Sequence, residues 1–129
     1  MMTYKEKLED QVNQIGLAGM VNELVNYCYG LSKEAGWHDN PREVGTMLAL
    51  IHSEVSESLE GFRKDINDDH LPNRKMAEVE LADAVIRIFD LAGSQGFDLG
   101  GALKEKLVYN MNRLDHKAEN RKKQNGKKF

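Results

Sequence analysis

The chain has 129 residues, a formal net charge of −3, 40% hydrophobic residues and 30% charged residues. This length predicts a single domain over residues 1–129, with a modest hydrophobic core. The lone cysteine, Cys28, excludes an intrachain disulfide and favours a reducing compartment. No stretch approaches the roughly 20 apolar residues that a membrane-spanning helix needs, and no apolar signal core follows Met1. We therefore expect a cytoplasmic protein with no membrane partner.

One helix, preceded by a helix-prone segment, is expected in the first third of the chain. Residues 3–14 are charged and helix-prone, and Gly16 interrupts them. From Met20 onward, apolar residues recur at helical spacing until Gly36, a residue type that favours a helix C-terminus. Trp37, the only tryptophan, then falls in a connection. It either covers the core or offers a flat surface on which a nucleotide base stacks.

A second helix is predicted to begin near Asn40, which suits an N-cap, with Pro41 in the first turn and Glu43 at the capping-box position. Its apolar stripe comprises Val44, Met47, Leu48, Ile51, Val55, Leu59 and Phe62. At the edge of this stripe lie Glu54 and Glu57, three residues apart and on nearly the same side of the helix. Such half-desolvated acids suit a metal site, although the pattern alone also fits an ordinary solvated face.

The polar segment 65–70 follows, with the Asp-x-Asn-x-Asp spacing that begins a calcium loop. His70 stands where that loop requires a glycine, and Met76 stands where it requires a bidentate glutamate. We therefore reject a calcium hand and expect a solvated turn.

A third helix is predicted from about Asn73 to Ser94. Apolar residues cover most of its circumference, so it must be surrounded, and a partner subunit is expected to help cover it. The exception is one polar stripe, formed by Glu80, Asp83, Arg87 and Asp90. Either the last three members form an ion-pair ladder, or a metal ion bridges the stripe to the preceding helix.

The second and third helices therefore each carry two acids spaced by three residues. If the helices face each other, four carboxylates surround one point: Glu54, Glu57, Glu80 and Asp83. Oxygen-only ligands of this kind suit a hard divalent cation, Mg²⁺ or Mn²⁺.

Asp98 is expected to cap a final long helix. Beside its apolar stripe lie Lys106, Asn110, Arg113 and Lys117, at steps of four, three and four along one predicted helix face. In isolation this is an ordinary solvated face. Opposite an acidic metal cluster, the same stripe is what a polyphosphate ligand requires.

The tail from Lys117 to Phe129 carries six cations and one anion. It is either a solvated terminus or an arm that attracts phosphate. The acidic body and the lack of a helix-turn-helix or zinc-finger signature argue against a nucleic-acid partner.

The order and spacing of these motifs resemble the MazG-like family of all-α nucleoside triphosphate pyrophosphohydrolases. Twenty-two residues separate the two acid pairs, and the surrounding segments 51–60 and 82–88 resemble the family's two motif helices. Residues 106–113 are similar to its Lys-x-x-x-Asn-x-x-Arg helix, and 126–129 to a frequent ending. Segment 114–125 departs from the family, where a shorter link bearing proline and histidine is expected.

The resemblance implies an all-α, four-helix-bundle-like fold, assembled as a homodimer or homotetramer. It implies Mg²⁺-dependent hydrolysis of a (deoxy)nucleoside triphosphate to the monophosphate and pyrophosphate, with Mn²⁺ as an alternative ion. The four carboxylates would hold the ion, and the catalytic candidates are Glu54 and Glu57, without a choice of which glutamate is the general base. The residues implied to bind phosphates, sugar or base are Lys106, Asn110, Arg113 and Trp37.

Two alternatives stay open at this point. A phosphoribosyl-ATP pyrophosphohydrolase would share the fold and the reaction but act on another nucleotide. A non-enzymatic helical binding module with an acidic ridge would share only the fold.

Overall fold

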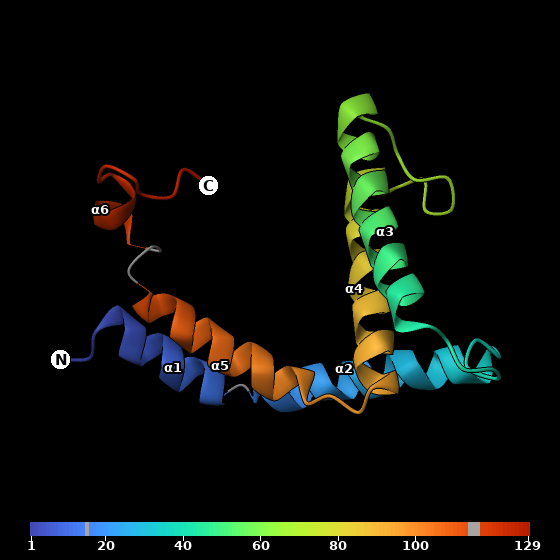
Figure 1. Ribbon diagram of the computed structural model, residues 1–129, viewed down its shortest axis with the longest axis horizontal. Coiled ribbons are helices and arrows are strands. Elements are labelled where there is room, and N and C mark those ends of the chain that lie inside the picture. Colours follow the sequence, from blue (N-terminus) through green and yellow to red (C-terminus); the bar gives the residue numbers. More distant parts are fainter. Residues whose placement is uncertain (15, 114–116) are drawn as a thin grey trace. The chain divides into compact units, whose positions relative to one another are not determined.

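The computed structural model describes residues 1–14, 16–113 and 117–129, and its regular structure is helical (Figure 1). The helices of these residues are α1 (Tyr4–Gln14), α2 (Leu17–Glu34), α3 (Val44–Lys64), α4 (Met76–Ser94), α5 (Leu99–Asn112) and α6 (Ala118–Arg121). The predicted all-α class is confirmed. Among the described residues, no helix combines the length and the apolar character that crossing a membrane demands.

The chain divides into two compact units. The first comprises residues 1–22 and 98–129, and within it α1 and α5 lie side by side (Figure 1). The second comprises residues 23–97, which include most of α2 and all of α3 and α4. The single-domain organisation expected for residues 1–129 stays a prediction.

Small residues allow α3 and α4 to pack closely at the end where the connecting loop joins them. Ser58, Gly61 and Ala77 are buried there, and the Ser58 hydroxyl donates a hydrogen bond of 2.8 Å to the Ala77 carbonyl. A Cβ added at Gly61 would lie 2.7 Å from the Ala77 backbone nitrogen, closer than atoms tolerate. This close approach fixes the two helices as an adjacent pair (Figure 1).

The loop between α3 and α4 is a hydrogen-bonded turn rather than a calcium loop. The Asp68 carboxylate accepts bonds from the backbone N–H groups of His70 and Leu71, at 2.9 and 2.8 Å. Asp68 is buried, so the expectation of a solvated turn is wrong at this residue. Its acceptor role is structural, because it satisfies backbone donors of the turn.

Both acid-bearing helices begin about three residues later than the sequence predicts. α3 starts at Val44 with Glu43 as its N-cap, because the backbone of Glu43 is extended, with a φ of −75° and a ψ of 126°. α4 starts at Met76, because the Met76 N–H donates to the Ile66 carbonyl and the strand-like pair of Asn67 with Lys75 keeps the preceding chain extended. The predicted starts at Asn40 and Asn73 are therefore wrong, while the helices themselves are confirmed.

The helix ends in the rest of the chain follow local chemistry. Gly36 has a φ of +88°, which glycine adopts freely, and it follows the end of α2 as predicted. The Asp98 side chain caps α5 by accepting a bond of 2.9 Å from the Gly101 N–H. α5 ends at Asn112, and the backbone of Arg113 is extended. The predicted continuous helix face from Lys106 to Lys117 is therefore wrong at Arg113, and residues 114–116 lie outside the described residues.

The second unit buries few large apolar side chains. Its buried hydrophobic residues are Val25, Met47, Ala77, Ala84 and Ala92. Large apolar residues on α3 and α4 stay exposed, among them Leu48, Val55, Leu59, Phe62, Leu81, Val85, Ile86 and Ile88. The helix that the sequence expects to be surrounded is thus only partly covered by the described residues of its own chain.

Candidate metal centre

Three carboxylates from two helices converge in the second unit. Glu54 and Glu57 come from α3 and Glu80 from α4, and one oxygen of each lies within 4.8 Å of one oxygen of the others. Glu54 is buried, Glu80 is half-buried and Glu57 is exposed, so the cluster opens to solvent at one side. The predicted convergence of the two acid-bearing helices is confirmed for these three residues.

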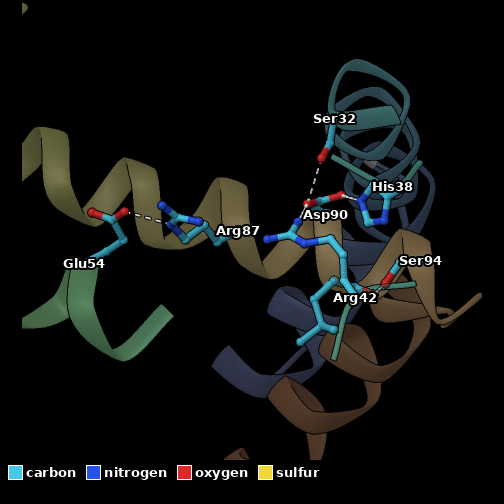
Figure 2. Close-up of polar contacts among 8 residues, drawn as sticks. Ser32, His38, Arg42, Glu54, Arg87, Asp90 and Ser94 are labelled. Atoms are coloured by element: carbon cyan, nitrogen blue, oxygen red, sulfur yellow. Dashed lines mark hydrogen bonds and ion pairs between the residues drawn. The ribbon is translucent and has the colours of Figure 1, made fainter. Parts of the chain in front are cut away.

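Arg87 supplies a cation at the buried end of the cluster. Its Nε donates to Glu54 Oε1 at 2.7 Å, so the arginine of α4 reaches across to α3 (Figure 2). Burial acts to raise the pKa of Glu54, but hydrogen bonds from Arg87 and Glu80 outweigh it and lower that pKa. The ladder expected among Asp83, Arg87 and Asp90 is therefore wrong, because both Arg87 and Asp90 have partners on other segments.

Glu80 carries the excess negative charge of the cluster. Its pKa is raised to about 7, first by burial and then by the adjoining carboxylates of Glu54 and Glu57. Near neutral pH this group is therefore poised between its protonated and ionised forms. A proton substitutes there for the positive charge that the cluster lacks.

Asp83 falls outside the group of three converging glutamates. Burial and then the negative charge of Glu54 raise its pKa, so Asp83 still experiences the field of the cluster. Its assignment as a fourth metal ligand stays a prediction.

The donor set of the three glutamates fits a hard divalent cation. All three offer oxygen, the ligand atom that Mg²⁺ and Mn²⁺ prefer. Arg87 pairs with Glu54. The raised pKa of Glu80 indicates that Arg87 does not offset all of the negative charge of the three glutamates. The cluster can therefore hold a metal ion.

Asp90, two turns further along α4 from Asp83, belongs to a second polar cluster that sequence reasoning missed. One carboxylate oxygen accepts from Ser32 Oγ at 3.0 Å and from Arg42 Nη1 at 3.2 Å, and the other contacts His38 Nε2 at 2.8 Å (Figure 2). Asp90 is buried, and its partners come from α2 and from the segment between α2 and α3. We call these four residues the Asp90 cluster. Their only signal in the sequence is an acid on an otherwise apolar helix, which does not identify its partners.

Trp37 lies beside this cluster and is exposed. It retains 66% of its accessible surface, so the interpretation that it covers the core is wrong. The guanidinium carbon of Arg42 lies 5.8 Å from the centre of the indole ring, within the range of a cation–π contact. Base stacking on Trp37 stays a prediction.

The other residues predicted to bind substrate belong to the first unit. The ammonium group of Lys106 lies 4.6 Å from the centre of the Tyr109 ring on the same helix. Asn110 Oδ1 is buried and has no hydrogen-bond partner among the described residues. Arg113 follows the helix end rather than continuing its face. The substrate roles of these three residues, and the role of the basic tail, stay predictions.

No protein-family model matches the chain, and comparisons with curated proteins and with solved structures return no match.

Proposed function

We propose that this chain is a Mg²⁺-dependent nucleoside triphosphate pyrophosphohydrolase of the MazG-like kind, which converts a (d)NTP to the (d)NMP and pyrophosphate. The observation that carries the proposal is the convergence of Glu54, Glu57 and Glu80 from two separate helices. An acid pair with i, i+3 spacing is common on its own, but three glutamates from two helices that meet at one point are not expected of unrelated solvated faces. Their spacing in the sequence is also the one that resembles the family.

In this proposal Glu54, Glu57 and Glu80 hold Mg²⁺, with Asp83 completing the set. When bound, the ion neutralises phosphate charge and increases the acidity of bound water. Arg87 restrains Glu54, and Glu80 retains a proton near neutrality until a cation replaces it. Hydrolysis adds one water across the α–β anhydride, and a carboxylate of the cluster takes the proton that the water loses.

The proposed substrate contacts divide by chemistry. Lys106 and Arg113 provide cations for phosphate oxygens, and Trp37 provides a flat exposed ring for a base. The amide of Asn110 has both donor and acceptor atoms, so it suits a phosphate oxygen or a sugar hydroxyl. These assignments rest on the resemblance and on the character of each side chain.

We also propose a homo-oligomer, a dimer or a tetramer, in the cytoplasm. The support is the exposed apolar surface of α3 and α4, where Phe62 retains 70% and Leu59 retains 60% of its accessible surface. Apolar surface on this scale favours association. Light scattering at micromolar concentration tests this part, and a folded, active monomer contradicts it.

The experiment that tests the reaction is a turnover panel over the common NTPs and dNTPs with Mg²⁺, with pyrophosphate and monophosphate both quantified. Equal amounts of the two products, lost on chelation of the metal, are expected. Phosphoribosyl-ATP belongs in the same panel, because faster turnover of that compound would assign the chain to that substrate instead. No turnover of any nucleotide, with Mn²⁺ binding also absent, would indicate a non-enzymatic helical module.

A further inference from the structure

We infer that Asp90 is a positioning residue for Trp37. Through Arg42 and His38 it holds the segment that bears this tryptophan against α4, the helix that also carries Glu80. The ligand side of this inference rests on the proposed function, in which the exposed indole receives a nucleotide base.

The anchoring of the segment begins at its N-terminal side. The backbone N–H of Trp37 donates to the backbone carbonyl of Ser32 at 3.1 Å, and the Ser32 hydroxyl donates to Asp90. His38, the next residue, contacts the other Asp90 oxygen and lies edge-on to Tyr29, with ring centres 5.0 Å apart. Residues on both sides of Trp37 along the chain therefore contact one buried carboxylate through their side chains.

The indole itself is supported from the C-terminal side of the segment. Arg42 donates to Asp90 Oδ2, and its guanidinium group approaches the Trp37 ring. A guanidinium group that is fixed by a carboxylate is a pre-organised support for an aromatic ring. Trp37 remains largely exposed in this arrangement, so the ring keeps surface on which a base can stack.

The burial of Asp90 distinguishes this arrangement from a surface ion pair. The Asp90 side chain is 11% exposed, and those of His38 and Arg42 are 13% and 19% exposed. A buried carboxylate with three partners is held in one geometry, whereas exposed pairs contribute little order. If Trp37 is already ordered, nucleotide binding costs less conformational entropy. This effect changes KM rather than kcat.

The test uses the full chain and its single tryptophan, whose fluorescence reports Trp37 alone when excitation avoids tyrosine. The variants are Asp90→Asn and Arg42→Met, with Arg42→Lys as the conservative replacement. Asp65→Asn is the control, because it removes the same charge from an exposed ion pair with Lys75, where asparagine also suits the left-handed backbone.

Time-resolved anisotropy without nucleotide comes first. The inference predicts more fast local motion of Trp37 in Asp90→Asn and Arg42→Met, partial return in Arg42→Lys, and no change in Asp65→Asn. Unchanged anisotropy in both Asp90→Asn and Arg42→Met overturns the positioning role. Because this readout needs no turnover, it is decisive even if the proposed hydrolysis fails.

Steady-state kinetics and Mn²⁺ titration of the same variants come second. KM is expected to rise about tenfold while kcat stays within about twofold. Mn²⁺ affinity is expected to stay at the wild-type value. A fall in kcat together with weaker Mn²⁺ binding would show that Asp90 acts through the metal-bearing helix and would overturn the inference. Arg42→Met keeps the buried carboxylate and two of its partners, so the test survives if Asp90→Asn fails to fold.

Discussion

The helix α4 carries two carboxylates in opposite electrostatic situations, although they lie only ten residues apart. Asp90 faces two hydrogen-bond donors and a histidine. Glu80 faces two further glutamates, and Arg87 of the same helix pairs with Glu54. The first carboxylate has its partners within the chain, whereas the raised pKa of the second shows that the surrounding glutamates add negative charge to it. A buried acid therefore indicates a ligand site only when neighbouring side chains leave its negative charge without hydrogen-bond donors or cations.

The largest expected effect is on turnover. Each carboxylate of the proposed metal site is expected to be needed for turnover, because the metal requires its negative charge. Neutralising any one of them should lower kcat/KM by at least about a hundredfold. The four variants are Glu54→Gln, Glu57→Gln, Glu80→Gln and Asp83→Asn. Pyrophosphate release under saturating Mg²⁺ measures it, with circular dichroism as the check on folding. Wild-type turnover in two of the four variants would refute the metal-site assignment.

Loss of negative charge in the Asp90 cluster is expected to change stability instead. Asp90→Asn should lower the free energy of unfolding by about 2 kcal/mol, because Arg42 and His38 lose a buried partner. Chemical denaturation measures the change, with Asp65→Asn as the exposed control. Unaltered stability would mean that the contacts of the Asp90 cluster contribute nothing net.

The same type of change at Glu80 should have the opposite sign. In the absence of metal, Glu80→Gln is expected to raise the free energy of unfolding by roughly 1 kcal/mol at pH 8, a value kept small because solvent screens a half-exposed cluster. Destabilisation by Glu80→Gln would contradict the view that the glutamate cluster lacks positive charge.

The pH dependence of this effect follows from the raised pKa. Glu80 has an ordinary value of 4.5 and a folded-state pKa of about 7, so the folded protein holds its proton to higher pH than the unfolded chain does. Its contribution to stability is therefore fully present below about 4.5 and is lost as the pH rises to about 7. The difference between Glu80→Gln and the wild type should grow across this window in metal-free unfolding curves. A constant difference would show that Glu80 does not titrate there.

The smallest expected effect concerns Arg87, the cation that already occupies part of the cluster. Arg87→Gln should tighten Mn²⁺ binding severalfold, by about 1 kcal/mol, because a competing positive charge is removed. Isothermal titration measures it, and Arg74→Gln is the control, since Arg74 pairs with Glu78 at an exposed position of the same unit. Weaker Mn²⁺ binding in Arg87→Gln would mean that Arg87 orders Glu54 for the metal instead.

Local patterns made the all-α class, the helices and the meeting of Glu54, Glu57 and Glu80 predictable, but Asp83 lies outside that group. The spacing of Glu54 and Glu57 places both on one helix face. The helix ends at Gly36 and Asp98 are set by the conformation and hydrogen bonds of residues next to them in the chain. The exact starts of α3 and α4 were not predictable in the same way, because backbone bonds of the intervening loops decide them.

Long-range pairing explains what the sequence analysis missed. Arg87 has acids on its own helix within reach, but the rotation of α4 against α3 directs it to Glu54, 33 residues away. The partners of Asp90 lie 48 to 58 residues away in the chain, on separate segments. Periodicity within one helix carries no information about such partners.

The most direct test of the central claim is to measure Mn²⁺ binding to the wild-type protein and to Glu57→Ala by isothermal titration calorimetry at neutral pH. Glu57 is exposed, so its removal leaves the packing of α3 against α4 intact and changes only the ligand set. The account predicts saturable Mn²⁺ binding to the wild type, accompanied by proton release as Glu80 ionises, and loss of both in Glu57→Ala. Equal binding in the two proteins, or none in either, would contradict the claim that the three glutamates form a metal centre.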